Sequence, residues 1–235
     1  MIDGLLREIS EILLPEKNTC LVCGYKDPYI NTSYICLHCE SLLARLEGIL
    51  CIKCSKSMAN DGDLCGDCVK MEKVFDKSLA LFQYRDEAKA LINDFKYHNK
   101  SYLYKVFGFQ MVKFLKDIDL TDIKAVVPVP VHKAKELKRG YNQSELLASY
   151  ISFNLGLPML KLVKRNKDTT PQSRLEGYAR WNNMAGAFEI DKGVPIPDKI
   201  LLVDDIYTTG STVNECSKVL KKWGADEIIC LAIAR

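Results

Sequence analysis

Short apolar runs alternate with longer amphipathic segments from residue 75 to residue 235. The apolar runs predict strands over residues 78–84, 125–129, 158–163, 200–203 and 227–234. Helical periodicity predicts helices over residues 86–97, 102–115, 143–155 and 211–223. Because strands and helices alternate along the chain, the strands should form a mostly parallel sheet joined by right-handed crossovers. The predicted fold class of this part is therefore α/β.

The first fourteen residues carry apolar side chains at helical spacing, among them Ile2, Leu6, Ile9 and Leu13. Charged residues interrupt this pattern, so it predicts an amphipathic helix packed on the protein rather than a signal peptide. No apolar run approaches the roughly 20 residues that a membrane-spanning helix needs, and no membrane span is predicted. Together these features predict a cytoplasmic protein.

Eight of the ten cysteines form four Cys-x-x-Cys pairs. The pairs are Cys20 with Cys23, Cys36 with Cys39, Cys51 with Cys54, and Cys65 with Cys68. A two-residue gap lets both thiolates face one tetrahedral ion, so four pairs predict two four-thiolate zinc sites. Such sites keep no position for water, which indicates a structural role for both ions. Sequential pairing of neighbouring pairs is favoured, although a crossed pairing has the same sequence.

The charge divides at the same place as the cysteines. Residues 1–72 contain 7 Lys and Arg against 11 Asp and Glu, a net charge of −4, and residues 73–235 carry +7. We therefore predict two domains: an N-terminal helix with a double zinc ribbon over residues 1–72, and the α/β domain over residues 73–235. Two four-thiolate zinc centres would make the first domain still more acidic, so the basic second domain is the better candidate for binding nucleic acid.

An acidic pair and a Thr/Gly/Ser loop follow the apolar strand 200–203. The acids are Asp204 and Asp205, and the loop is Thr208-Thr209-Gly210-Ser211-Thr212. The amides and hydroxyls of such a loop, with the start of the next helix, form a cradle for an anion. Carboxylates beside it suit sugar hydroxyls or a metal ion, so a sugar phosphate fits both parts. The alternative is an ordinary strand–turn–helix in which Ser211 caps the helix.

This string resembles the phosphoribosyl-pyrophosphate (PRPP) signature of type I phosphoribosyltransferases. Together with the four cysteine pairs, nearly the whole chain resembles the ComF family of competence-associated proteins. Further stretches that fit this family are residues 95–97, 127–130, 139–143, 170–175, Arg180, Asn183 and 186–188. The resemblance implies a type I phosphoribosyltransferase fold with an N-terminal double zinc ribbon.

The resemblance also implies roles for individual residues. The acidic pair would hold the ribose hydroxyls with Mg²⁺ nearby, and the Thr/Gly/Ser loop would hold the 5′-phosphate. The basic loop after Pro130 would face the pyrophosphate. Residues 169–183 would form a flap over PRPP. The expected PRPP-binding residues are Asp204, Asp205, Thr208, Thr209, Gly210, Ser211, Thr212, Lys133, Lys135 and Gln172. The expected catalytic residues are Asp204, Asp205, Arg180, Lys138 and Arg139. On spacing alone, the basic residues are also compatible with a solvated face.

The function implied by the resemblance is PRPP binding and a role in DNA uptake during natural transformation, on the cytoplasmic side. Purine-salvage relatives carry an acid at the position of Thr208, so this chain is not expected to use a 6-oxopurine, and whether it is an enzyme stays open. One alternative is an active phosphoribosyltransferase with another acceptor. The other is a non-catalytic protein that binds single-stranded DNA or serves as an adaptor for a helicase or a DNA-uptake channel protein.

Overall fold

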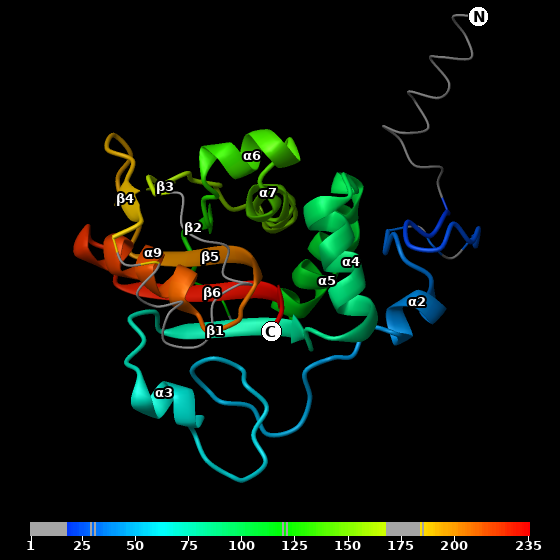
Figure 1. Ribbon diagram of the computed structural model, residues 1–235, viewed down its shortest axis with the longest axis horizontal. Helices are drawn as coiled ribbons and strands as arrows, with labels where there is room; N and C mark the ends of the chain where they lie inside the picture. The colour runs from blue at the N-terminus through cyan, green and yellow to red at the C-terminus, as the bar shows by residue number, and fades with distance from the viewer. Residues whose placement is uncertain are drawn as a thin grey trace, which may run out of the picture.

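The computed structural model describes residues 18–28, 30, 32–118, 120, 122–167, 184 and 186–235. In this part of the chain a four-stranded parallel sheet has the order β1-β6-β5-β2, and β3 and β4 form a separate antiparallel pair (Figure 1). The strands are β1 Lys77–Phe82, β2 Ala125–Pro128, β3 Val163–Arg165, β4 Phe188–Ile190, β5 Lys199–Ile206 and β6 Glu227–Ala234. The helices are α2 Leu37–Ser41, α3 Gly66–Lys70, α4 Asp86–Tyr97, the 3₁₀ turn η1 Ser101–Leu103, α5 Tyr104–Lys116, α6 Lys133–Arg139, α7 Gln143–Leu155 and α9 Ser211–Lys222.

The two central strands, β5 and β6, are buried on both faces, as their continuous apolar sequences require. Successive residues of β5 point to opposite faces. Leu201 and Val203 belong to a core that includes side chains of α4, α5 and α7, whereas Ile200 and Leu202 belong to a second core that includes side chains of α9, β3 and β4. The expected class, a mostly parallel sheet flanked by helices, is confirmed.

Segments of the cysteine-rich region pair with the open edge of β1. The Ser78 amide donates to the Lys53 carbonyl at 2.8 Å, and the Ser55 hydroxyl donates to the Ser78 carbonyl at 2.8 Å. Farther along the strand, the Leu46 amide donates to the Leu81 carbonyl at 3.0 Å. An edge strand with unpaired amides and carbonyls invites pairing with other chains, so these contacts protect the sheet as well as anchoring the cysteine-rich region.

Several predicted elements differ from the structure. The segment 158–163 is not a regular strand: Met159 makes a single bridge to Val126, and β3 begins only at Val163. Strand β4 was not predicted. The basic segment after Pro130, predicted as a loop, forms α6, because it is rich in helix-forming Lys, Ala, Glu, Leu and Arg and its first turn is capped by His132.

The N-terminal segment 1–14 and the whole of the predicted flap 169–183 lie outside the described residues. The domain boundary after residue 72 stays a prediction. Among the helices that the structure describes, none combines the length and the apolar character needed to cross a membrane.

The contact between α5 and α7 depends on Gly108. A Cβ at this buried position would lie 2.6 Å from Cδ1 of Tyr150. We expect Gly108→Ala to lower the free energy of unfolding, because overpacking costs roughly 1–3 kcal/mol and outweighs the roughly 1 kcal/mol that Ala gains over Gly in a helix. Urea denaturation at constant zinc concentration measures the change. Gly62→Ala is the control, since a Cβ there meets no atom within 4 Å. Equal unfolding free energies for the two variants would contradict this account of the packing.

Candidate functional site

Asp204 and Asp205 lie at the carboxyl end of β5, the edge at which parallel sheets bind ligands. Lys96, near the end of α4, places its Nζ 2.9 Å from Oδ1 of Asp205, and the two side chains are only 14% and 13% exposed. Oδ1 of Asp204 accepts hydrogen bonds from the Ser144 hydroxyl at 3.0 Å and from the Asp205 amide at 2.9 Å. Side chains of α4 and α7 therefore orient the two acids.

The environment of Asp204 disfavours its negative charge. Burial raises the pKa of Asp204 to about 7, and the neighbouring charge of Asp205 acts in the same direction. Lys96 and the hydrogen bonds from the Asp205 amide and Ser144 lower this pKa but do not cancel the effect of burial. Perturbed carboxyl pKa values occur at functional sites and also in structural ion-pair networks.

The loop after the acids turns tightly around the ring of Tyr207. This ring is buried and lies edge-on to Phe75, with 6.1 Å between the ring centroids. Gly210 has φ +80°, and a Cβ there would lie 2.2 Å from the Tyr207 hydroxyl oxygen. Glycine is therefore required both by the left-handed backbone and by the close approach of the tyrosine.

Helix α9 begins at Ser211, with Gly210 as its N-cap and no side-chain hydrogen bond from the cap. The N-cap is therefore Gly210 and not Ser211, whereas the strand–turn–helix arrangement of that alternative is present. The Ser211 amide and hydroxyl instead hydrogen-bond with Oγ1 of Thr209, at 3.4 and 3.2 Å. A helix start with a glycine cap presents backbone amides to an approaching anion.

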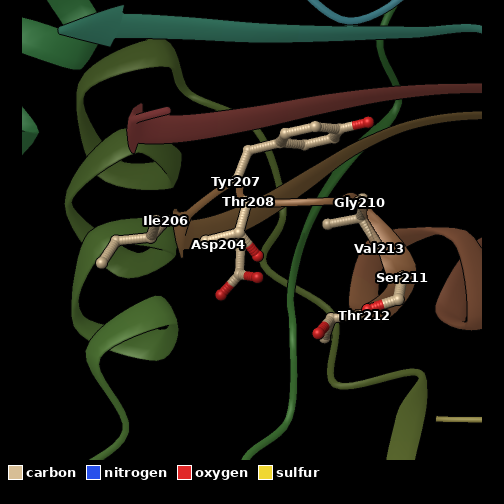
Figure 2. Close-up of a pocket in the computed structure, with 8 residues that line it drawn as sticks. All are labelled: Asp204, Ile206, Tyr207, Thr208, Gly210, Ser211, Thr212 and Val213. Carbon is tan, nitrogen blue, oxygen red and sulfur yellow. The ribbon is translucent and has the colours of Figure 1, made fainter. Parts of the chain in front are cut away.

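Asp204 and the loop border one small pocket (Figure 2). Its lining residues are Asp204, Ile206, Tyr207, Thr208, Gly210, Ser211, Thr212 and Val213. In Figure 2 the carboxylate of Asp204 lies on one side of this space, and Ser211 and Thr212, at the start of α9, lie on the other. The fold thus brings one predicted acid, Asp204, to the same pocket as four of the five predicted loop residues, Thr208, Gly210, Ser211 and Thr212.

The four predicted cations of α6 occupy different environments. Lys133 and Lys138 are exposed, whereas Lys135 and Arg139 are half-buried. The Arg139 guanidinium carbon lies 5.0 Å from the ring centroid of Tyr97, the residue after Lys96. The end of α6 is therefore connected, through Tyr97, to the helix end that supports Asp205. Gln172 and Arg180 lie outside the described residues.

Two stretches that resemble the ComF family meet behind the acidic pair. The carbonyl of Phe95 accepts hydrogen bonds from the Tyr141 hydroxyl at 2.6 Å and from Nε2 of Gln143 at 3.2 Å. In the described part of the chain, the side chains of Lys96 and Ser144 contact the acids, and neither was predicted as a site residue. Their only signal in the sequence is their position, Lys96 within residues 95–97 and Ser144 next to residues 139–143.

The eight paired cysteines form two groups, each with all four sulfur atoms within 4.8 Å of one another: Cys20, Cys23, Cys36 and Cys39 in the first, and Cys51, Cys54, Cys65 and Cys68 in the second. These are the groups of the sequential pairing. The Sγ atoms of Cys23 and Cys36 are 3.8 Å apart, and those of Cys54 and Cys65 are 3.6 Å apart. A tetrahedral ion with zinc–sulfur bonds of about 2.3 Å requires sulfur separations near 3.8 Å, so both groups fit zinc.

The chain is similar to a known domain family and to curated bacterial proteins. A family described as "Double zinc ribbon domain" matches residues 9–69. "Competence protein F" of Haemophilus influenzae is 32% identical over 223 residues, which cover 86% of this chain and 97% of that protein. "Competence protein ComFC" of Streptococcus pneumoniae is 29% identical, with 92% and 99% covered. "DNA utilization protein YhgH" of Escherichia coli K12 is 26% identical, with 86% and 90% covered.

Solved structures with local similarity include two proteins whose names refer to phosphoribosyl chemistry. Glutamine PRPP amidotransferase from Bacillus subtilis has a TM-score of 0.36 and 17% identity, with 53% of this chain and 26% of that chain covered. Adenine phosphoribosyltransferase from Leishmania tarentolae has a TM-score of 0.35 and 16% identity, with 55% of each chain covered. Both TM-scores lie below 0.5, and both identities lie below 25%.

The raised pKa of Asp204 predicts a pH-dependent stability of the ligand-free protein. An unfolded Asp has a pKa near 3.9, so between about pH 4 and pH 7 the native state binds more protons and the free energy of unfolding falls as pH rises. Asp204→Asn removes this contribution. We expect the variant to gain at least about 1 kcal/mol relative to wild type between pH 5 and pH 8, measured by urea denaturation at fixed zinc concentration. Parallel pH profiles of the two proteins would contradict the prediction.

Proposed function

The chain belongs to the ComF family of competence proteins, and from this premise we propose that it binds PRPP with Mg²⁺ and serves in DNA uptake on the cytoplasmic side. The observation that carries the proposal is the shared pocket of Asp204 and the loop that ends in α9. A ligand with a ribose diol and a 5′-phosphate matches the two sides of this pocket: hydroxyls donate to carboxylates, and phosphate oxygens accept from amides and hydroxyls.

Asp204 and Asp205 are also the residues that would hold Mg²⁺ beside the diphosphate. Carboxylate oxygens suit this hard cation, and the ion supplies neutralisation of phosphate charge when it is bound. Lys96 already pairs with Asp205 at 2.9 Å. A ligand or ion that binds Asp205 therefore has to share or replace this ion pair.

The same site is compatible with transfer of the phosphoribosyl group to an acceptor other than a 6-oxopurine. In that reaction the bond from ribose C1 to pyrophosphate breaks as the acceptor adds. The cations of α6 would stabilise the charge on the departing pyrophosphate. Thr208 offers a hydroxyl where purine-salvage relatives have an acid, so it cannot serve as an equivalent general base.

Binding of single-stranded DNA is a second candidate function, supported by the surface of α6. This helix carries Lys133, Lys135, Lys138 and Arg139 within seven residues, and Arg139 packs against Tyr97, which is 61% exposed. Cations that follow a phosphate backbone and an exposed aromatic ring on which bases stack are the usual components of such a surface. The names of the relatives, which refer to competence and DNA utilization, agree with this role.

The zinc ribbon supports a third possibility, an adaptor for a helicase or a DNA-uptake channel protein. Its described part exposes large apolar side chains, including Leu37 at 84%, Val69 at 69% and Ile52 at 58%. Side chains of this kind suit contact with another protein. On this hypothesis, Cys51→Ser would weaken the capture of such a partner.

We expect Asp204→Asn/Asp205→Asn to weaken PRPP binding at least tenfold in the presence of Mg²⁺, because each charge-assisted hydrogen bond to the ligand is worth roughly 1.5–3 kcal/mol. Isothermal titration calorimetry measures the affinities. Asp117→Asn/Asp122→Asn is the matched control, since it removes two exposed carboxylates just ahead of β2, away from the carboxyl ends of the strands. If the active-site double variant binds PRPP as tightly as wild type, the assignment of the acidic pair is wrong.

Replacing Lys133, Lys135, Lys138 and Arg139 by alanine should weaken the binding of an oligothymidylate and flatten its salt dependence. Each lost phosphate contact reduces the slope of log K against log salt by about 0.7 for a single strand. Fluorescence anisotropy at several salt concentrations gives the slope. Lys77, Lys116, Lys124 and Lys192, all exposed, form a control set of equal charge. Equal slopes for the two quadruple variants would rule out α6 as the DNA-binding surface.

A further inference from the structure

The two cysteine groups pack against opposite faces of the α/β domain. Cys20, Cys36 and Cys39 of the first group belong to the core of α4, α5 and α7. Cys51, Cys54 and Cys65 of the second group belong to the other core, which also contains two residues of the candidate site, Tyr207 and Val213. Figure 1 shows the same separation: α2, from the first group, lies beside α4 and α5, whereas α3, from the second, lies beyond β1.

The segment that follows the second cysteine group is hydrogen-bonded to the loop Thr208–Thr212, here called the phosphate loop, and to the helix that follows it. Nζ of Lys73 donates to the carbonyl of Thr209 at 3.3 Å. The next residue, Val74, donates its amide to Oδ1 of Asn214, in the first turn of α9, at 2.8 Å. Phe75 then supports the ring of Tyr207. Three consecutive residues thus fix the loop and the start of the helix from behind.

A second connection runs directly from a cysteine of this group. The Arg235 guanidinium donates to the backbone carbonyl of Cys54, and its central carbon lies 4.8 Å from the ring centroid of Tyr207. Because the Tyr207 hydroxyl occupies the space that a side chain at Gly210 would need, the position of this ring determines the shape of the loop. Displacement of Cys54 would therefore be transmitted to the loop through Arg235.

The charge of Lys73 is a further link between the second cysteine group and the loop. Lys73 is only 6% exposed. Burial lowers the pKa of Lys73, and the sulfur atoms of Cys68 and Cys54 oppose this by favouring the charged amine. A four-thiolate zinc centre carries a formal charge of −2, so the loaded centre supplies the counter-charge that a buried ammonium group requires.

The first cysteine group makes its contacts elsewhere. Arg45, which follows α2, donates to Gln110 of α5 at 2.8 Å, and Tyr34 lies edge-on to Tyr150 of α7 at 6.5 Å. These contacts end on α5 and α7, on the face of the sheet opposite to Tyr207. The first group therefore provides an internal control for any effect of zinc on the loop.

We propose that the second cysteine centre supports the phosphate loop, with Lys73 and Arg235 as positioning residues. Loss of zinc from this centre, and not from the first, then weakens phosphate-ligand binding at Thr208–Thr212. The ligand in this inference, PRPP, rests on the proposed function. The coupling between the centre and the loop rests only on the contacts above.

The test compares Cys68→Ser in the second group with Cys23→Ser in the first, in the full chain. Each variant is expected to lose one of two zinc ions, measured by release to a chromogenic chelator. Cys68→Ser should weaken PRPP binding at least tenfold in calorimetry with Mg²⁺, whereas Cys23→Ser should change it less than twofold. Equal losses of affinity in both variants, or none in either, would overturn the proposal.

Lys73→Met provides a variant that keeps all eight cysteines. We expect it to retain two zinc ions and to lose affinity for PRPP at least fivefold, and Lys73→Arg to recover part of that affinity. Unchanged affinity in Lys73→Met would remove Lys73 from the proposal. Lys73→Met therefore tests the support of the loop even if Cys68→Ser fails to fold.

Hydrogen–deuterium exchange separates the coupling from the identity of the ligand. Without ligand, amides of residues 207–212 should exchange at least threefold faster in Cys68→Ser and Lys73→Met than in wild type, but not in Cys23→Ser. Faster exchange together with a wild type that does not bind PRPP would refute the proposed function and leave the coupling supported. Normal PRPP binding by wild type with unchanged exchange in every variant would refute the coupling alone.

Discussion

The burial of two adjacent carboxylates at the end of β5, together with their mutual repulsion, is the constraint around which the candidate site is arranged. Asp204 and Asp205 are adjacent residues near the end of β5, a strand whose apolar part is buried on both faces. Lys96 offsets the charge of Asp205, and Ser144 donates to Asp204. For these contacts to form, α4 has to end beside β5, and α7 has to begin there. The hydrogen bonds from Tyr141 and Gln143 to the carbonyl of Phe95 hold the two helices in that arrangement.

A second constraint is the tight turn that follows the acids. The chain must reverse from β5 into α9, and it does so around the buried ring of Tyr207 and the left-handed Gly210. Such a turn has few contacts of its own, so it depends on what lies behind it. Lys73, Phe75 and Arg235 provide this support, and all three lie on the side of the second cysteine group. The zinc ribbon covers β1, and its link to the site is the hydrogen bond from Arg235 to the Cys54 carbonyl.

The sequence predicts the parts of the fold that have a strong local signal. The bounds of α4 and α7 follow from helical periodicity, and β5, the acidic pair and the loop follow from one continuous string. Lys96 has no such signal, because a lysine near the end of an amphipathic helix has the same pattern whether it faces solvent or a carboxylate. The sequence pattern around Ser144 likewise indicates only a residue at the start of a helix. Strand β4 has only three residues and depends on its pairing with β3, so its formation is set by tertiary contacts rather than by local preference.

The energetics of the acidic pair bear on whether the site is built for binding or for transfer. Burial makes the ligand-free pair unfavourable when both acids are charged, and a ligand that brings Mg²⁺ and hydroxyl donors relieves that cost. Ligand binding can therefore be favourable without any group that moves a proton to or from an acceptor. Phosphoribosyl transfer additionally needs an acceptor held against ribose C1, and the residue in the position of the purine-salvage acid is the exposed Thr208. The described residues therefore offer groups suited to a ribose phosphate but no equivalent of the purine-salvage acid, which agrees with the proposal of PRPP binding more closely than with transfer.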